Sequence, residues 1–186
     1  MIRKYLLFAT LLLLPAISRA QVVAAGRGGN QQLFAGGFFS DFGPDYGFQR
    51  LYGIGGFADY NLTPRLGAEA EARFLRFHQL ANIHEDTYLI GPKINYGRKK
   101  FIFYGKGLFG LGEFNFPQNA AHGSYFAIGL GGGVDYRLSH RFYARGEYEY
   151  QIWPGFVGPP DSATTGNRAN GLTPNGFSVG MSYRIF

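Results

Sequence analysis

The sequence predicts an all-β fold: an eight-stranded antiparallel up-and-down transmembrane β-barrel, preceded by a cleavable signal peptide. Three observations predict it. Apolar and polar residues alternate with a period of two from residue 32 onward, the pattern of strands with two different faces. Turn residues divide this pattern into eight segments. Glycine is abundant, with 29 residues, and each glycine inside a helix costs about 1 kcal/mol relative to alanine.

The N-terminal residues 1–20 have the organisation of a secretory signal peptide. Arg3 and Lys4 precede an apolar run over residues 5–14, and the small-residue segment 18–20 then supplies a cleavage site. The apolar run is too short for a membrane-spanning helix, which needs about 20 residues. We therefore expect an exported protein.

The charge and cysteine content exclude two other classes of protein. Arg3, Lys4 and Arg19 lie in the signal peptide, so the formal net charge of +6 is halved in the exported chain. A balance this even, with no basic run longer than residues 98–100, argues against a nucleic-acid partner. An exported chain without cysteine also has no disulfide scaffold. We expect its stability to come from packing or from the membrane.

The alternation divides into eight expected strands, at residues 32–40, 49–60, 65–77, 86–96, 101–115, 124–138, 141–153 and 175–186. The connections alternate between short ones near residues 62, 98 and 140 and long ones at 41–48, 78–85, 116–123 and 154–174. Short turns at one end and long loops at the other are typical of bacterial outer-membrane barrels, whose short turns are periplasmic. An even strand number then puts both mature termini in the periplasm. We expect three parts: a signal peptide (1–20), a flexible lead-in (21–31) and an outer-membrane β-barrel domain (32–186).

The orientation of the two faces decides between two classes of barrel. In the expected strand 65–77, Leu66, Ala70 and Phe74 share one face, whereas Glu69 and Arg73 share the other. A soluble lipocalin-like carrier would turn the apolar face inward, whereas an outer-membrane barrel would turn it towards lipid. The period is two in both cases, so the decision rests on three further features.

Aromatic residues on the apolar faces gather near strand ends, as expected for rings at the level of lipid headgroups. The predicted membrane-interface aromatics are Tyr60, Tyr96, Phe101, Tyr136, Phe142 and Tyr183 at the short-turn end, with Tyr150 and Trp153 at the other end.

The charges assigned to the inward face balance, with six of each sign. The acids are Asp59, Glu69, Glu71, Asp135, Glu147 and Glu149, and the bases are Arg73, Lys93, Lys106, Arg137, Arg145 and Arg184. Buried charges must be paired, whereas a solvated face needs no such balance. We expect a lumen ionic network formed by Glu69, Glu71, Arg73, Lys93, Lys106, Asp135, Arg145, Glu147 and Glu149. The charges that break the pattern lie beside the long loops: Arg50, Arg76, Asp86 and Glu113.

The last strand, residues 176–186 (GFSVGMSYRIF), resembles the terminal signature of bacterial outer-membrane barrels. With the signal peptide and the eight strands, the chain resembles the small OmpA/OmpX-like eight-stranded outer-membrane β-barrel family. The resemblance implies that Tyr183, Ile185 and Phe186 form an assembly signal, read by the barrel-assembly machinery. One departure is that Ile185 holds the register of the preceding apolar residues and Phe186 falls on the other face. Either the strand bulges at its end or Ile185 takes the role of the terminal residue.

Three motifs favour neither catalysis nor a cofactor. Residues 105–110 match the glycine pattern of a dinucleotide-binding loop, but more strand follows instead of a helix. His122 and Ser124 resemble the H-x-S pattern of lipid A deacylases, yet Asp135 is too distant and Glu149 faces the lumen. Loop histidines such as His84 are too scattered to predict a metal site.

We expect a barrel with a structural or surface-interaction role that is not an enzyme and has no cofactor. Its expected partners are outer-membrane lipid, the barrel-assembly machinery and an extracellular partner that binds loop 154–174. A narrow channel for ions or small solutes is the main alternative. A soluble lipocalin-like carrier and a lipid-modifying barrel enzyme are further alternatives.

Overall fold

The structure is a computed structural model, and it describes residues 31–45, 50–77, 83–115, 122–160 and 168–186. The predicted signal peptide (1–20) and all of the predicted lead-in except Gln31 lie outside the described residues. Within the described part of the chain, no helix is both long enough and apolar enough to cross a membrane.

The described residues form nine strands. Their bounds are β1 (Gln32–Gly43), β2 (Leu51–Asn61), β3 (Leu66–Phe77), β4 (His84–Arg98), β5 (Phe101–Asn115), β6 (His122–Arg137), β7 (Phe142–Pro160), β8 (Arg168–Leu172) and β9 (Asn175–Arg184).

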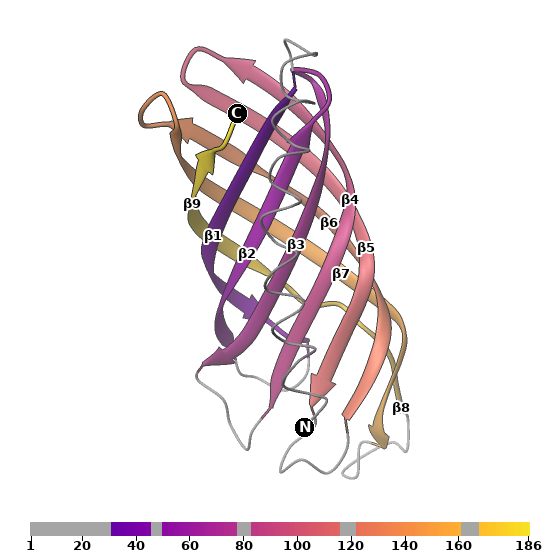
Figure 1. Ribbon diagram of the computed structural model, residues 1–186. Coiled ribbons are helices and arrows are strands. Elements are labelled where there is room, and N and C mark those ends of the chain that lie inside the picture. Colours follow the sequence, from indigo (N-terminus) through magenta and orange to yellow (C-terminus); the bar gives the residue numbers. More distant parts are fainter. Residues whose placement is uncertain (1–30, 46–49, 78–82, 116–121, 161–167) are drawn as a thin grey trace, which may run out of the picture.

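Eight of these strands close into an antiparallel barrel (Figure 1). Each strand from β1 to β7 pairs with the next, and β9 pairs with both β7 and β1. A backbone hydrogen bond of 2.7 Å from Ile185 to Leu33 extends the seam between the two ends of the barrel. The start of β1 and the end of β9 therefore lie side by side at the end that carries the short turns. The predicted eight-stranded up-and-down barrel is confirmed.

The ninth strand corrects the prediction of an irregular loop at 154–174. β7 continues to Pro160 and forms a hairpin with β8, which pairs with no other strand in the described residues. The register of this hairpin shifts between Trp153 and Val157 and again before Pro160. Prolines are tolerated at strand edges and irregularities, so the proline-rich composition hid a strand.

Side-chain hydroxyls fix two of the short turns. The Thr63 Oγ1 accepts a hydrogen bond of 2.9 Å from the Leu66 amide, and the Ser139 Oγ accepts one of 3.2 Å from the Phe142 amide. Lys99, in the turn between β4 and β5, has a positive φ of 58°. Short polar segments of this kind reverse the chain within two to four residues, as the sequence predicted.

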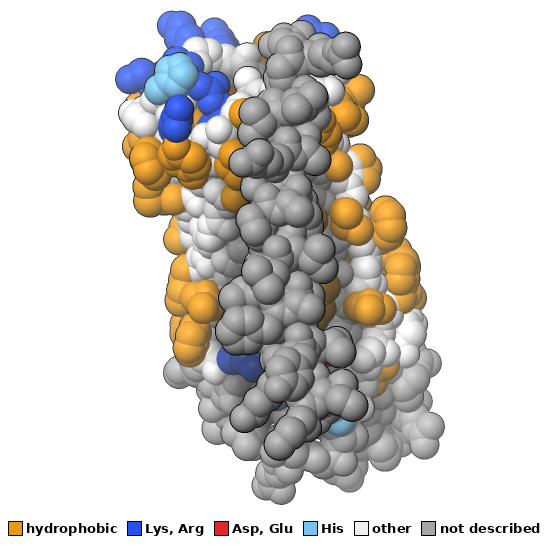
Figure 2. Space-filling model, viewed as in Figure 1, with side chains coloured by type: hydrophobic (Ala, Val, Ile, Leu, Met, Phe, Trp, Pro, Cys, Tyr) orange, Lys and Arg blue, Asp and Glu red, His pale blue; other side chains and the backbone are white. Residues whose placement is uncertain are grey.

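The predominantly apolar faces of β3, β4, β5, β6, β7 and β9 point outward, and Figure 2 shows hydrophobic side chains along both flanks of the barrel. Ile94 is 62% exposed and Phe103 is 50% exposed, whereas Glu69 is 1% exposed. This arrangement is the reverse of what a soluble lipocalin-like carrier requires. Lipid must cover a surface of this kind, because water does not stabilise so much exposed apolar area.

The β4–β5 ladder yields the first prediction, which concerns Gly91. A Cβ at Gly91 would lie 2.1 Å from the Gly107 carbonyl oxygen and 2.9 Å from the Leu108 Cα, and these backbone atoms have no room to move. We expect Gly91→Ala to destabilise the barrel by about 1–3 kcal/mol, as overpacking does. The readout is the fraction of unboiled protein that migrates as folded barrel on a gel. Gly97→Ala is the control, since nothing lies within 4 Å of its Cβ position; equal folding of the two variants would contradict the prediction.

Candidate functional site

The candidate site is the charged interior of the barrel, built by side chains that alternate into the lumen from six strands. Because side chains alternate along a strand, three inward-facing residues in a row are charged on β3 and three are charged on β7. The lumen charges come from β2 (Asp59), β3 (Glu69, Glu71, Arg73), β4 (Lys93), β5 (Lys106), β6 (Asp135) and β7 (Arg145, Glu147, Glu149). All ten are buried.

Like charges lie directly opposite each other on neighbouring strands, which is destabilising unless opposite charges intervene. Lys93 is opposite Lys106, and Asp59 is opposite Glu69. Glu69 separates the two lysines, with its Oε2 at 2.9 Å from the Lys93 Nζ and its Oε1 at 2.8 Å from the Lys106 Nζ. Each pair of like charges is therefore bridged by groups of the opposite sign.

Arg145 joins the half of the network nearer the short turns. Its guanidinium lies 2.6 Å from Asp59, 2.9 Å from Glu69 and 2.8 Å from Asp135. The Lys93 Nζ lies 2.7 Å from the same Asp59 carboxylate. Since these residues come from β2, β3, β4, β6 and β7, the contacts connect opposite walls of the barrel.

Lys106 joins the other half. Its Nζ lies 2.6–3.0 Å from four carboxylates, those of Glu69, Glu71, Glu147 and Glu149. Arg73 lies 2.8 Å from Glu149 and 3.0 Å from Glu71. The carboxylates of Glu71, Glu147 and Glu149 lie within 4.8 Å of one another, close enough to hold a metal ion. The Lys106 ammonium already supplies the positive charge at that position.

Aromatic rings line the network. The Arg145 guanidinium lies 3.7 Å from the Phe57 ring centroid, and the Lys93 Nζ lies 3.9 Å from that of Tyr104. The Tyr104 hydroxyl donates a hydrogen bond of 2.7 Å to Glu147. Cation–π contacts of this kind strengthen when water is excluded. The rings therefore fill space and also stabilise the cations.

The lumen holds fewer cations than the sequence predicted. Arg137 is exposed, and the Arg184 guanidinium donates a hydrogen bond of 2.9 Å to the His140 ring. The prediction that both belong to the lumen is wrong. Both have inward parity, but they are the last residues of β6 and β9, where side chains reach solvent. The six predicted lumen acids therefore share four cations, two fewer than the carboxylates that contact them: Arg73, Lys93, Lys106 and Arg145.

An apolar layer closes the lumen on the long-loop side of the charges. A hydrogen-bonded chain leads into it, since Gln151 donates to Glu149 at 2.8 Å and Trp153 donates to Gln151 at 2.9 Å. Trp153 then packs with Leu89, Leu108, Phe114, Ala127 and Leu172. A second buried group consists of Phe42, Leu51 and Leu75. Charges and apolar side chains thus fill successive layers of the lumen.

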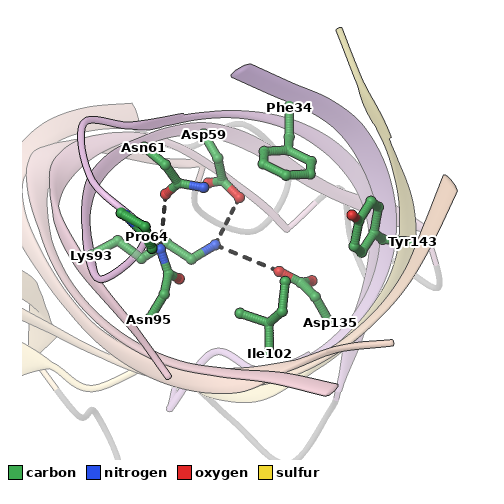
Figure 3. Close-up of a pocket in the computed structure, with 9 residues that line it drawn as sticks. All are labelled: Phe34, Asp59, Asn61, Pro64, Lys93, Asn95, Ile102, Asp135 and Tyr143. Carbon is green, nitrogen blue, oxygen red and sulfur yellow. Dashed lines mark hydrogen bonds and ion pairs between the residues drawn. The ribbon is translucent and has the colours of Figure 1, made fainter. Parts of the chain in front are cut away.

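The short-turn end instead contains a small cavity of about 30 Å³, open to solvent and lined by both polar and apolar side chains (Figure 3). Asn95 donates a hydrogen bond of 2.8 Å to Asn61 at its rim. The cavity is lined by Phe34, Asp59, Asn61, Pro64, Lys93, Asn95, Ile102, Asp135 and Tyr143. Sequence reasoning missed this cavity, although two asparagines on inward positions near the same turns were the available signal.

Comparison with known proteins identifies the family that has this architecture. Residues 6–184 match the model of the family described as "Outer membrane protein beta-barrel domain". The chain belongs to this outer-membrane β-barrel family. No curated protein matches the chain in sequence.

Several solved structures share the fold of this outer-membrane barrel. Neisserial surface protein A matches with a TM-score of 0.58 and 12% identity, over 82% of this chain and 96% of that one. The N-terminal β-barrel domain of Pseudomonas aeruginosa OprF matches with a TM-score of 0.55 and 14% identity, over 84% and 98%. OprG from the same species gives 0.52 and 12%, over 84% and 96%. Identities this low establish a common fold and leave the function open.

One predicted interface aromatic of the outer-membrane barrel is wrong: Trp153 is 0% exposed and lies inside the lumen. Its parity is that of Glu149 and Gln151, so alternation along β7 turns it inward. The others lie on the outer face: Tyr96, Phe101, Phe142 and Tyr150 are exposed, and Tyr60, Tyr136 and Tyr183 are half-buried.

The residues of the predicted assembly signal lie at the barrel seam. Tyr183 is the penultimate residue of β9, whereas Ile185 and Phe186 follow the strand and are both exposed. The Phe186 carbonyl oxygen accepts a hydrogen bond of 3.3 Å from the Leu33 amide. The backbone pairing therefore continues past the end of β9. Recognition of these residues by the barrel-assembly machinery stays a prediction.

The H-x-S motif lies on the outer face near the long loops, where His122 and Ser124 are exposed. Glu113, an acid that sequence reasoning did not pair with the motif, lies directly opposite Ser124 on β5. No hydrogen bond or ion pair joins these three side chains within the described residues. A catalytic triad requires those hydrogen bonds, so the arrangement is not that of an assembled hydrolase site.

The second prediction concerns Lys106. Lys106→Met would leave four buried carboxylates without their shared cation, and breaking a buried ion pair in this way costs about 3–5 kcal/mol. We expect the free energy of unfolding to fall by that amount in denaturant titrations of the protein in lipid vesicles. Lys100→Met is the control, since Lys100 is exposed and we expect a change within about 0.5 kcal/mol. If the two variants unfold alike, the network does not stabilise the barrel.

Proposed function

We propose that this outer-membrane barrel has a structural or surface-interaction role, with a lumen filled by paired charges and both mature termini in the periplasm. The observation that carries the proposal is the double closure of the lumen. One layer is the ion-paired network around Lys106 and Arg145, and the next is the apolar group around Trp153. An ion crossing the barrel would have to break both layers.

The dimensions of the barrel support the same role. Eight strands enclose a lumen that side chains can fill completely, whereas channel-forming porins have 16 or more strands. The small cavity at the short-turn end is lined by Lys93 and Asp59, the first ion pair of the network. Solvent that enters this cavity therefore meets a salt bridge, so we propose that the lumen does not conduct.

We propose that the β7–β8 hairpin, within the predicted loop 154–174, binds an extracellular partner. β8 pairs only with β7 among the described strands, and Figure 1 places it at the end of the barrel opposite the C-terminus. The amide of Thr173, beside the hairpin, donates a hydrogen bond of 3.3 Å to Asp45 at the end of β1. A hairpin that is tied at its base and projects beyond the barrel offers a partner an accessible backbone edge.

We also propose that the barrel has no catalytic role. The candidate nucleophile Ser124 is not hydrogen-bonded to His122 in the described residues, and Glu71 and Glu149 in the lumen are paired with Lys106. A general base needs access to a substrate proton, which groups in a closed lumen do not have.

The third prediction tests the closure of the lumen. We expect purified barrel in a planar bilayer with concentrated potassium chloride to give no discrete conductance steps, because the lumen is filled at two levels. A 16-stranded porin serves as the positive control. Regular steps whose size changes in Glu71→Gln would contradict the proposal and favour a narrow channel for ions or small solutes.

The fourth prediction tests the orientation in the membrane. The chain contains no cysteine, so single-cysteine variants can be labelled selectively with a membrane-impermeant maleimide. We expect Arg50→Cys, at the long-loop end, to react in intact cells and Lys100→Cys, at the short-turn end, to react only after permeabilisation. Both side chains are exposed, so access through the membrane is what differs between them. The opposite labelling pattern would put the termini outside the cell.

A further inference from the structure

Seven basic residues gather at the short-turn end of the barrel, outside the lumen. They come from all three short turns and from the end of β9, and we call them the basic rim: Arg65, Arg98, Lys99, Lys100, Arg137, Arg141 and Arg184. Six are exposed and Arg184 is half-buried. The corresponding turn segments, residues 61–66, 97–101 and 137–141, contain no aspartate or glutamate.

Backbone hydrogen bonds place neighbouring members of the basic rim side by side. The Arg137 amide donates to the Lys100 carbonyl oxygen at 2.8 Å, and the Arg184 amide donates to that of Arg141 at 2.7 Å. The Asn95 amide donates at 2.8 Å to the Arg65 carbonyl oxygen, which places that turn beside β4. Figure 2 shows Lys and Arg side chains gathered with a histidine at this end of the molecule. The members of the basic rim therefore lie at the same end of the barrel, and two pairs of them are joined through the backbone.

No carboxylate among the described residues neutralises the charges of the basic rim. None of the seven residues forms a salt bridge with a carboxylate in the described part of the chain. At the other end of the barrel, by contrast, Arg50 pairs with Asp41, and Arg76 pairs with Asp86. Uncompensated cations in contact repel one another, so this surface is stabilised when an external anion binds.

The position of the basic rim relative to the outer aromatic residues indicates which class of external anion binds there. Arg137 directly follows Tyr136, Arg141 directly precedes Phe142, and Arg184 directly follows Tyr183. Arg141 also donates a hydrogen bond of 2.6 Å to the Tyr183 hydroxyl. Aromatic rings mark the boundary between hydrocarbon and headgroups. One residue further along a strand is about 3.3 Å, so the cations lie at the depth of the lipid phosphates.

We propose that the basic rim binds the phosphate groups of anionic phospholipids in the leaflet that surrounds the short-turn end. Guanidinium groups bind phosphate through paired hydrogen bonds, and five of the seven residues are arginine. Because the rim borders the aromatic residues around the outside of the barrel, headgroups meet it in any bilayer. This inference goes beyond the proposed function, since it names a lipid class and does not depend on the extracellular partner.

The test measures how much phosphatidylglycerol the protein retains. The barrel is reconstituted in vesicles with equal parts phosphatidylglycerol and phosphatidylcholine, and native mass spectrometry counts each lipid that stays bound. We expect wild-type protein to retain phosphatidylglycerol preferentially. In Lys100→Gln/Arg137→Gln we expect this preference to fall about fivefold, since each cation near an anionic surface contributes measurably to binding. Symmetric vesicles make the result independent of orientation in the cell.

A matched double variant at the other end of the barrel provides the control. Arg50→Gln/Arg76→Gln removes the same charge from residues that already have acidic partners, and we expect it to retain phosphatidylglycerol as the wild type does. Heat-modifiable gel mobility verifies that each variant is folded. If the control double does not fold, the single variants Lys100→Gln and Arg50→Gln make the same comparison.

Three outcomes would overturn the proposal. The first is equal retention of the two lipids by wild-type protein. The second is retention by the rim variant that matches the control. The third is an absence of lipid preference together with binding of soluble polyglutamate that the rim variant loses. That third result would assign the basic rim to an acidic protein partner.

Discussion

The contact on which the rest of the structure depends is that of the Lys106 ammonium with four carboxylates from two walls of the barrel. Glu69 and Glu71 come from β3, and Glu147 and Glu149 come from β7, so one cation connects strands that share no backbone hydrogen bonds. A barrel in lipid gains little from burying apolar side chains inside, since the lipid is equally apolar. Its interior is instead specified by charges that must each find a partner. Glu69 extends the constraint to Lys93, so the two halves of the network form a single unit.

This constraint explains why the two ends of the barrel differ. Toward the long loops, the hydrogen-bonded chain from Glu149 through Gln151 ends at Trp153, whose ring closes the lumen with apolar neighbours. Toward the short turns, the network ends at a small cavity that is open to solvent and bordered by asparagines. Basic residues beyond that cavity pair with no carboxylate of the described residues. Their side chains are directed to solvent at the short-turn end, where they form the basic rim. The same residue types thus have different roles at different heights along the barrel axis.

The errors in prediction from sequence all lie near the ends of strands or in the long loop. Arg137 and Arg184 have the parity of lumen residues, and Trp153 has the parity of Glu149, so alternation alone assigns all three inward. The two arginines nevertheless lie outside the lumen because they are at the ends of their strands. Trp153 was assigned to the membrane interface because it lies near a loop, whereas its place in the alternation was the better guide. The β7–β8 hairpin was not predicted because its irregular register and its prolines give no period-two signal.

The sequence alone determined the class of fold, the number of barrel strands and the face of each strand that meets lipid. The fold class and the strand number follow from alternation and turn chemistry, which act between residues close together in the chain. The face that meets lipid follows from the aromatic residues near strand ends and from the balanced charges on the opposite face. The tertiary structure alone decided which cation meets which carboxylate, where the lumen closes and which arginines leave it. Those properties depend on the relative heights of strands across the barrel. Those heights are set by the stagger accumulated around the closed sheet, which no single segment of the chain encodes.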